Sequence, residues 1–301
     1  MVSHNIDFTI TTHEDHALRH FREFQPDIVV FDLIQLDDHC INEITELCRT
    51  VSLSPIFNGL GVVDEVFHRS AIRGKDWPTE GSGPVWNCSL DYAIISHHCE
   101  KVPTETYQHN LERPTLSVAI SMGGGDAANK TLQLLERLKD IEDRMIFWAL
   151  LGEGYAHSYE NLVRCTRDGK HEIILAKTNE SMWRILNSCS LLILAGGTTT
   201  YEAAYAGIPS INTLQSADHF FLIEELVQAG ACRHAGYTFE ESLAGLRGAI
   251  TRLNRNRDEL SRMHCAARSL IDGKGAARVA NQIMSQAPMP VNGSTLPQTG
   301  D

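Results

Sequence analysis

The second half of the chain alternates short apolar runs with segments in which apolar residues recur at helical spacing. Six of these runs predict strands, and they are Leu116–Ser121, Met145–Leu151, Ile173–Ala176, Leu191–Ala195, Ser210–Thr213 and Ala231–His234. Strands that alternate with helices favour a doubly wound parallel sheet. In such a sheet, ligands bind beyond the carboxyl ends of the strands.

The first half of the chain has a weaker pattern. Strands are predicted at Ile6–Thr11, Ile28–Leu33 and Val62–Phe67, and helices at His13–Phe24 and Asp38–Arg49. Glycines and prolines interrupt the stretch from Ser52 to Ser89, so that stretch is predicted to form mainly loops.

The domain boundary is predicted from a change in polarity. The apolar run Tyr92–Ile95 is followed by a polar segment, Glu100–Arg113, which is typical of an interdomain connection. We therefore expect an incomplete Rossmann-like domain over residues 1–112 and a second Rossmann-like domain over residues 113–286. Residues 287–301 are rich in Pro, Gly, Ser and Thr, and we expect a disordered tail. Its segment Leu296–Gly300 resembles a sortase recognition sequence, which we interpret as a chance match or a tag.

Composition excludes several classes of protein. The chain has 301 residues, 43% of them hydrophobic, which is enough for two domains of ordinary size. A formal net charge of -12, with no cluster of Lys and Arg, argues against nucleic-acid binding. The eight cysteines lack CxxC spacing, as expected of reduced thiols. Because neither a leader nor a long apolar run is present, we expect a soluble, cytoplasmic protein that does not insert into membranes. We also expect a monomer.

Two glycine-rich turns stand between a predicted strand and a predicted helix. The first contains Gly123, Gly124 and Gly125, and Asp126 is placed to cap the helix that follows. Glycine lets the backbone approach a ligand closely. If the strand order follows the usual rule, both turns lie at one edge of the sheet, where they would suit a nucleotide diphosphate.

The second turn is the more informative of the two. Gly196 and Gly197 precede three threonines, which are Thr198, Thr199 and Thr200. Unpaired amides in the first turn of a helix favour an anion, and the threonine hydroxyls could donate further bonds to phosphate oxygens. Glu202 would repel phosphate but could accept hydrogen bonds from a ribose diol. The alternative is an ordinary helix start followed by a solvated glutamate.

Three segments together resemble the PseG/SpsG group, the UDP-2,4-diacetamido-2,4,6-trideoxy-altropyranose hydrolases. They are Ile120–Asp126, Ala195–Glu202 and Ile271–Val279, and their order and spacing also match. The resemblance covers residues 6–286 and includes Tyr92–Ile95 and Asp27–Leu36. It implies the two-domain GT-B fold of the MurG-type glycosyltransferases.

The same resemblance implies a function related to pseudaminic acid synthesis for surface glycans. Water would attack the anomeric carbon of a UDP-sugar and UDP would depart, with no metal or other cofactor. The glycine turns would hold the diphosphate, Glu202 the ribose, and Asp218 would lie at the sugar end. Three hypotheses stay open, namely a UDP-sugar hydrolase, a glycosyltransferase and a binding protein without catalysis.

The sequence also departs from the family pattern. The family begins with a GxGHxxR loop, whose histidine is the presumed base, and the chain has no such segment, so we expect a truncated or absent start. The early histidines, His4, His13 and His16, are expected to be solvated.

A second departure lies after Asp218, where the chain has His219 and Phe220 in place of the family's asparagine and glutamine. His219 is a weak candidate for a base, and the alternative is a solvent-facing histidine at a helix start. The adjacent His97, His98 and Cys99 could suggest a metal site, but neighbouring residues cannot easily ligate one ion, so we expect none.

Overall fold

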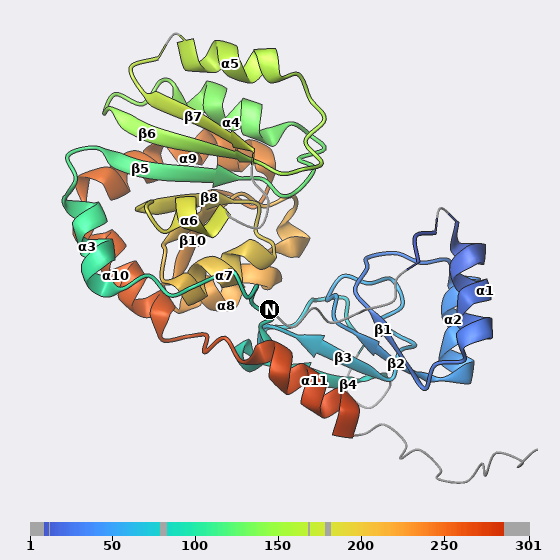
Figure 1. Ribbon diagram of the computed structural model, residues 1–301. Coiled ribbons are helices and arrows are strands. Elements are labelled where there is room, and N and C mark those ends of the chain that lie inside the picture. The colour runs from blue at the N-terminus through green and yellow to red at the C-terminus, as the bar shows by residue number, and fades with distance from the viewer. Residues whose placement is uncertain (1–8, 12, 79–82, 168, 178–181, 286–301) are drawn as a thin grey trace, which may run out of the picture. The chain divides into compact units, whose positions relative to one another are not determined.

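The chain folds into two compact units, which are described separately (Figure 1). The structure is a computed structural model that describes residues 9–11, 13–78, 83–167, 169–177 and 182–285. The first unit consists of the described residues of Met1–His68, Trp77–Asn87 and Ala277–Asp301. The second consists of those of Arg69–Asp76 and Cys88–Ala276. The predicted tail, the Leu296–Gly300 segment and His4 lie outside the described residues.

The second unit contains a six-stranded parallel sheet with the order β10-β9-β8-β5-β6-β7. Its strands are β5 (Leu116–Ser121), β6 (Met145–Leu151), β7 (Glu172–Lys177), β8 (Leu191–Leu194), β9 (Ser210–Asn212) and β10 (Cys232–His234). All six apolar runs that predicted strands in this half form strands. The strand order reverses between β5 and β8, as in Rossmann folds.

Helices lie on both faces of this sheet (Figure 1). The helical segments of this unit are η1 (Leu90–Tyr92), α3 (Thr104–Glu112), α4 (Lys130–Leu138), α5 (Tyr159–Arg167), α6 (Met182–Leu186), α7 (Thr198–Ala206), η2 (Ala217–His219), α8 (Phe221–Gln228), α9 (Phe239–Arg255) and α10 (Arg257–Arg268). The strands are buried between the helices, and Leu116, Phe147 and Ile193 are completely inaccessible to solvent. This explains why the strands read as continuous apolar runs rather than as alternating patterns.

The first unit contains a four-stranded sheet with the order β1-β2-β3-β4. Its elements are α1 (Glu14–Phe24), β1 (Ile28–Phe31), α2 (Asp38–Leu47), β2 (Arg49–Ser52), β3 (Glu65–His68) and β4 (Val85–Cys88), and the chain ends its described part in α11 (Gly275–Ser285). The pairs β1–β2 and β2–β3 are parallel. Half of the strand predicted at Ile6–Thr11 falls outside the described residues, and the part that is described, residues 9–11, has no strand.

The interpretation of Glu100–Arg113 as an interdomain connection is wrong. This segment contains α3, which is part of the second unit, so the two units divide the chain elsewhere than the predicted boundary near residue 112. Tyr107 is completely buried and its hydroxyl donates a 2.8 Å hydrogen bond to the carbonyl of Ser190. The polar composition misled the prediction because only one face of this helix packs against the sheet, with Tyr107, Asn110 and Leu111 buried.

The third family-like segment, Ile271–Val279, serves packing. A side chain at Gly275 would meet the carbonyl oxygen of Ala93 at 2.1 Å, so only glycine fits there. Gly273 has a φ of +80° and lies against the ring of Tyr205. These contacts hold the start of α11 against the stretch around Ala93 and against α7 within the second unit.

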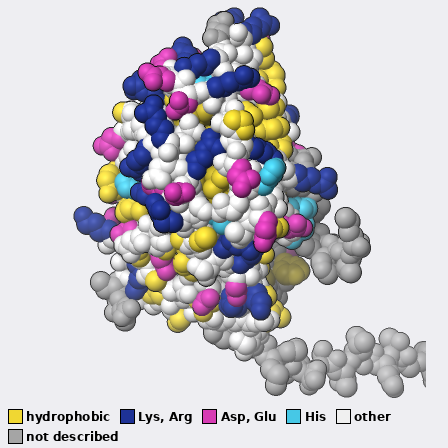
Figure 2. All heavy atoms as spheres, turned by 90° about the vertical axis from the view of Figure 1, so that its left-hand side faces the viewer, with side chains coloured by type: hydrophobic (Ala, Val, Ile, Leu, Met, Phe, Trp, Pro, Cys, Tyr) yellow, Lys and Arg dark blue, Asp and Glu magenta, His cyan; other side chains and the backbone are white. Residues whose placement is uncertain are grey.

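Charges of both signs are mixed on one face of the protein (Figure 2). On the face shown in Figure 2, Lys and Arg side chains are interspersed with Asp and Glu. None of the described helices is long and apolar enough to cross a bilayer.

The buried His264 of α10 makes the stability of the fold sensitive to acid. Its buried ring stacks on Tyr107, and its Nδ1 lies 2.5 Å from the carbonyl oxygen of Gly207. Burial lowers the pKa of His264 below its ordinary value of 6.5, although the Gly207 carbonyl acts in the opposite direction. The neutral ring is thus the folded form. Its contribution to stability is fully present above the unfolded pKa and is lost as the pH falls from there towards the lower folded pKa.

We therefore expect the free energy of unfolding of the wild type to fall more steeply from pH 7.5 to pH 5 than that of His264→Gln. The variant should also be about 1–3 kcal/mol less stable at pH 7.5, because it loses buried contacts. Urea unfolding followed by circular dichroism measures both quantities. Exposed His109→Gln is the control and should behave as the wild type. Equal pH slopes for the wild type and His264→Gln would contradict the prediction.

Candidate functional site

Both glycine turns lie at the same edge of the second unit's sheet, after neighbouring strands. β5 and β8 are paired in parallel, and their last paired residues are Ser121 and Leu194. Gly123 and Gly196 each stand two residues beyond this pair and have φ values of +90° and +77°. Only glycine adopts this backbone conformation readily, so the two turns are local consequences of the sequence. They occupy the point where the strand order reverses, which is where open α/β sheets bind ligands.

The start of α7 presents backbone amides to solvent. Gly197 precedes the helix and Thr198 begins it, and both are exposed. Within the described chain, no acceptor bonds the amides of Gly197, Thr198 or Thr199. A side chain added at Gly197 would meet no atom within 4 Å, so the turn is open. Unpaired amides and the positive end of the helix dipole make this a favourable place for an anion.

Thr200 does not face this opening, which corrects the expectation that its hydroxyl could reach a phosphate. Its side chain is 1% exposed, and its hydroxyl donates a 2.7 Å hydrogen bond to Oδ1 of Asn212. Its amide bonds the carbonyl of Gly197. Three consecutive threonines do not reveal in the sequence that Thr200 is the one on the inner side of α7. Thr198 is exposed and Thr199 is partly exposed, so both side chains are accessible.

The β5–α4 turn is held by Asp126. This side chain is 8% exposed, and its two oxygens accept hydrogen bonds from the amides of Lys130 (2.7 Å) and Thr131 (2.9 Å). The cap predicted at Asp126 is present, although α4 begins four residues later. Gly124 and Gly125 are exposed, and Gly124 has room for a further atom on its open side.

A third loop, after β6, supports the first glycine turn, and the sequence motifs did not reveal it. The amide of Gly154 donates a 3.1 Å hydrogen bond to the carbonyl oxygen of Gly124. A side chain at Gly152 would meet the same oxygen at 2.3 Å. His157 places its Nε2 2.8 Å from the carbonyl oxygen of Asp126. The spacing Gly152-Glu153-Gly154 directly after an apolar run was the signal that could have revealed this loop.

Glu202 is buried in α7. Its side chain is 8% exposed, and its Oε1 accepts a hydrogen bond of 3.2 Å from the amide of Ser96. Burial raises the pKa of the Glu202 carboxyl, against the opposing effects of the Ser96 amide and the charge of Arg69. No described residue donates a hydrogen bond to the second oxygen. The alternative of a solvated glutamate is therefore wrong.

Asp218 and His219 lie in η2, which follows β9. Because β9 neighbours β8, this segment follows the next strand at the same edge of the sheet as the two glycine turns. Asp218 is exposed and His219 is partly exposed. Phe220 packs against His234 and Tyr237, with ring centroids 4.9 Å and 5.2 Å away. Phe220, at which the sequence departs from the family pattern, thus packs against two other aromatic rings near this edge.

The other histidines named from the sequence have ordinary surroundings. His13 precedes α1, and both His13 and His16 are exposed. His97 and His98 lie against one another, with ring centroids 3.7 Å apart. Burial raises the pKa of the Cys99 thiol far above its ordinary value, and its Sγ bonds the Glu202 carbonyl. A protonated thiol is a poor metal ligand.

One cluster in the first unit has the composition of a metal site. It consists of Glu14, Asp37 and Cys40. The carboxylates already serve the start of α2, because Asp37 accepts from the amide of His39 and Glu14 from the amide of Asp37. Burial raises the pKa of the Cys40 thiol. The cluster is therefore explained by helix capping.

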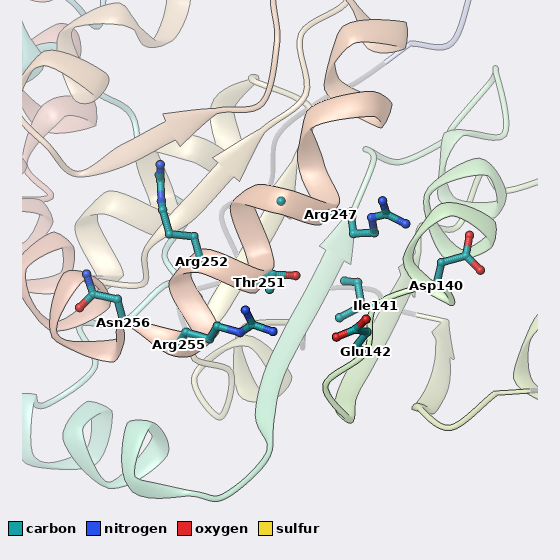
Figure 3. A pocket seen from close by; sticks show the side chains of 9 residues that line it. Asp140, Ile141, Glu142, Arg247, Thr251, Arg252, Arg255 and Asn256 are labelled. Atoms are coloured by element: carbon teal, nitrogen blue, oxygen red, sulfur yellow. The ribbon is translucent and has the colours of Figure 1, made fainter.

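A cavity of about 610 Å³ lies at the opposite edge of the second sheet (Figure 3). Arg247, Thr251 and Arg255 of α9 face Asp140 and Glu142, which precede β6. Charges of both signs on opposite walls suit a solvated groove better than a site for an anion. Its position at the amino ends of the strands also separates it from the glycine turns, so its size does not make it the candidate site.

Two curated proteins resemble the chain at low sequence identity, whereas no protein-family model matches it. An uncharacterised protein of Methanocaldococcus jannaschii is 24% identical over 207 residues, which are 66% of this chain and 42% of that protein. The spore coat polysaccharide biosynthesis protein SpsG of Bacillus subtilis is 22% identical over 279 residues, which are 88% of this chain and 78% of that protein. The chain thus spans less than half the length of the archaeal relative.

Three solved structures resemble the chain over nine tenths of its length. MurG of Acinetobacter baumannii has a TM-score of 0.59 and 16% identity, covering 90% of this chain and 77% of that one. A putative UDP-N-acetylglucosamine 2-epimerase of Listeria monocytogenes has a TM-score of 0.62 and 14% identity, covering 92% and 79%. The UDP co-structure of S. aureus MnaA has a TM-score of 0.56 and 11% identity, covering 90% and 78%. The chain has the GT-B type of fold, as predicted, with two Rossmann-like units.

Gly152→Ala tests the support of the first glycine turn. The added methyl group overlaps the carbonyl oxygen of Gly124, so the turn must shift and the free energy of unfolding should fall by about 1–3 kcal/mol. Gly248→Ala is the matched control, because that glycine lies inside α9 with open space around it. Alanine is the better helix former and should stabilise the protein by up to about 1 kcal/mol. Denaturant unfolding compares the two, and equal effects would contradict the proposed contact.

Proposed function

We propose that the second unit binds the diphosphate of a UDP-sugar at its two glycine turns. One observation carries the proposal: the exposed amides after β8 and the exposed glycines after β5 lie at adjacent strand ends, at the reversal of strand order. In this arrangement Gly197, Thr198 and Thr199 donate to one phosphate group. Gly124 and Gly125 approach the diphosphate from the neighbouring strand. Gly196 shapes the turn, and Thr200 anchors it in the core.

The comparisons support uridine as the nucleoside. The structure of S. aureus MnaA contains UDP, and a putative UDP-N-acetylglucosamine 2-epimerase shares the fold. The Bacillus subtilis relative is named as a spore coat polysaccharide biosynthesis protein. A UDP-sugar is the class of ligand that best agrees both with these proteins and with the family that the sequence resembles. In this proposal Glu202 accepts from the ribose diol, and Asp218 and His219 lie toward the sugar.

The proposed reaction is hydrolysis at the anomeric carbon, with a UDP-linked diacetamido-trideoxy sugar as the substrate. Water forms a bond to the anomeric carbon while the bond between that carbon and the diphosphate oxygen breaks. UDP leaves with its negative charge stabilised by the aligned amides, and such stabilisation of developing charge is the main contribution of sites of this kind to catalysis. The proton lost by water requires a base, for which His219 is the candidate at this edge.

An assay of UDP release tests the proposal directly. Incubation with UDP-sugars, and with the UDP-linked diacetamido-trideoxy sugar first among them, should release UDP without an added acceptor. Release only in the presence of an acceptor would replace hydrolysis by glycosyl transfer. Tight binding of UDP without turnover would indicate a binding protein. A failure to bind UDP or any UDP-sugar would overturn the proposed site itself.

Glu202→Ala should weaken the binding of UDP by about 1.5–3 kcal/mol, the size expected for hydrogen bonds to a charged group. Isothermal titration calorimetry at pH 8 measures the change. The matched control is Glu136→Ala, an exposed glutamate of α4 that should bind UDP as the wild type does. Unchanged affinity in a folded Glu202→Ala protein would remove Glu202 from the site.

A further inference from the structure

The side chain of Lys130 connects two segments that follow different strands at the candidate edge. Lys130 is the first residue of α4, and its amide donates a 2.7 Å hydrogen bond to Oδ1 of Asp126, after the first glycine turn. Its ammonium group reaches the loop after β9, where Nζ donates to Oε1 of Gln215. The sheet order places β8 between β5 and β9, so this side chain joins segments on either side of β8.

The loop after β9 packs against both glycine turns. One residue before Gln215, Cδ2 of Leu214 lies 2.9 Å from the position that a Cβ of Gly196 would take. Before Leu214, Oγ1 of Thr213 lies 3.7 Å from Sδ of Met122, which directly follows β5. The loop that accepts the lysine hydrogen bond is therefore in contact with the chain at the ends of both β5 and β8.

The ammonium group of Lys130 has bonding capacity that the described chain does not use. An ammonium group carries three N–H donors, and Gln215 is its hydrogen-bond acceptor within the described residues. The ring of Phe239 lies on another side, with its centroid 4.6 Å from Nζ. No carboxylate of the described residues forms an ion pair with this lysine. A donor therefore remains available for a ligand.

The surroundings of Lys130 favour an anion as that ligand. Its side chain is partly exposed, and burial lowers the pKa of the ammonium group, against the opposing effects of Asp126 and Glu240. Both oxygens of Asp126 already accept hydrogen bonds from backbone amides, and Glu240 is exposed. A cation that has lost part of its water is stabilised by a negative charge at short range. The unpaired amides at the start of α7 favour an anion at the same edge.

We propose that Lys130 is a further ligand-binding residue, whose ammonium group binds the phosphate that carries the sugar. The inference rests on the proposed function, in which the diphosphate lies at the two glycine turns. The loop that holds Lys130 continues into η2, where Asp218 and His219 lie toward the sugar in that proposal. A cation on this loop is thus on the sugar side of the diphosphate. In the proposed reaction that phosphate gains negative charge as its bond to the sugar breaks, and the lysine stabilises this charge.

A structural role for Lys130 makes a different prediction. If Lys130 only tied α4 to the loop after β9, the loss of either partner of the tie would have the same effect. Gln215→Ala removes the tie and keeps the charge, whereas Lys130→Met removes both and keeps an unbranched side chain over the Phe239 ring. Binding of a phosphate by Lys130 predicts a much larger loss of affinity in Lys130→Met than in Gln215→Ala.

The test measures dissociation constants of UDP and UMP by calorimetry in the full chain. UMP lacks the phosphate that would carry the sugar. For Lys130→Met we expect a loss of about ten- to a hundredfold for UDP and of less than about threefold for UMP, because the hydrogen bond to a charged phosphate is missing only with UDP. Lys139→Gln, which removes an exposed lysine from the other end of α4, is the matched control and should bind both as the wild type does.

The outcomes separate this inference from the proposed function. Equal binding of UDP by the wild type and Lys130→Met would overturn the inference and leave the function standing. Equal losses for UDP and UMP, or an equal loss in Gln215→Ala, would also overturn it. If the wild type binds inorganic pyrophosphate but not UDP, and Lys130→Met binds pyrophosphate more weakly, the lysine binds phosphate and the assignment of UDP fails. Binding of neither compound would overturn both.

Discussion

The parallel pairing of β5 with β8 is the constraint on which the candidate site depends. In the chain, β6, β7 and the helices around them separate these two strands, so no local contact brings their ends together. Their register places Gly123 and Gly196 at equivalent positions beyond the sheet. From there α4 and α7 begin with their amide ends at the same edge. A sheet with another strand order would separate the two turns.

The second constraint is the burial of α7. Most residues of this helix are buried, and its glutamate is buried with them. A buried carboxylate needs hydrogen-bond donors, and the surrounding chain provides the Ser96 amide. The stretch after η1 also packs on α7, where the Val102 amide bonds the Ala206 carbonyl. The site is thus supported by segments that are distant in sequence and carry no motif of their own.

The sequence predicted the second unit well because its signals are local. Buried parallel strands appear as apolar runs, and Gly123 and Gly196 mark turns that other residues adopt only with strain. The GT-B type of fold followed from a resemblance of spaced motifs. Long-range packing gave no such signal. The burial of Thr200 against Asn212, the close approach of Gly152 to Gly124 and the packing of α3 all depend on contacts between separate segments. The environment of Glu202 was missed for the same reason.

The central claim is that backbone amides at the two glycine turns hold the diphosphate of UDP. A crystal structure of the protein with UDP tests it most directly. We predict diphosphate oxygens within hydrogen-bond distance of the amides of Gly197, Thr198 and Thr199, with Gly124 and Gly125 alongside. Diphosphate bound elsewhere, for example among the arginines of the cavity in Figure 3, would contradict it.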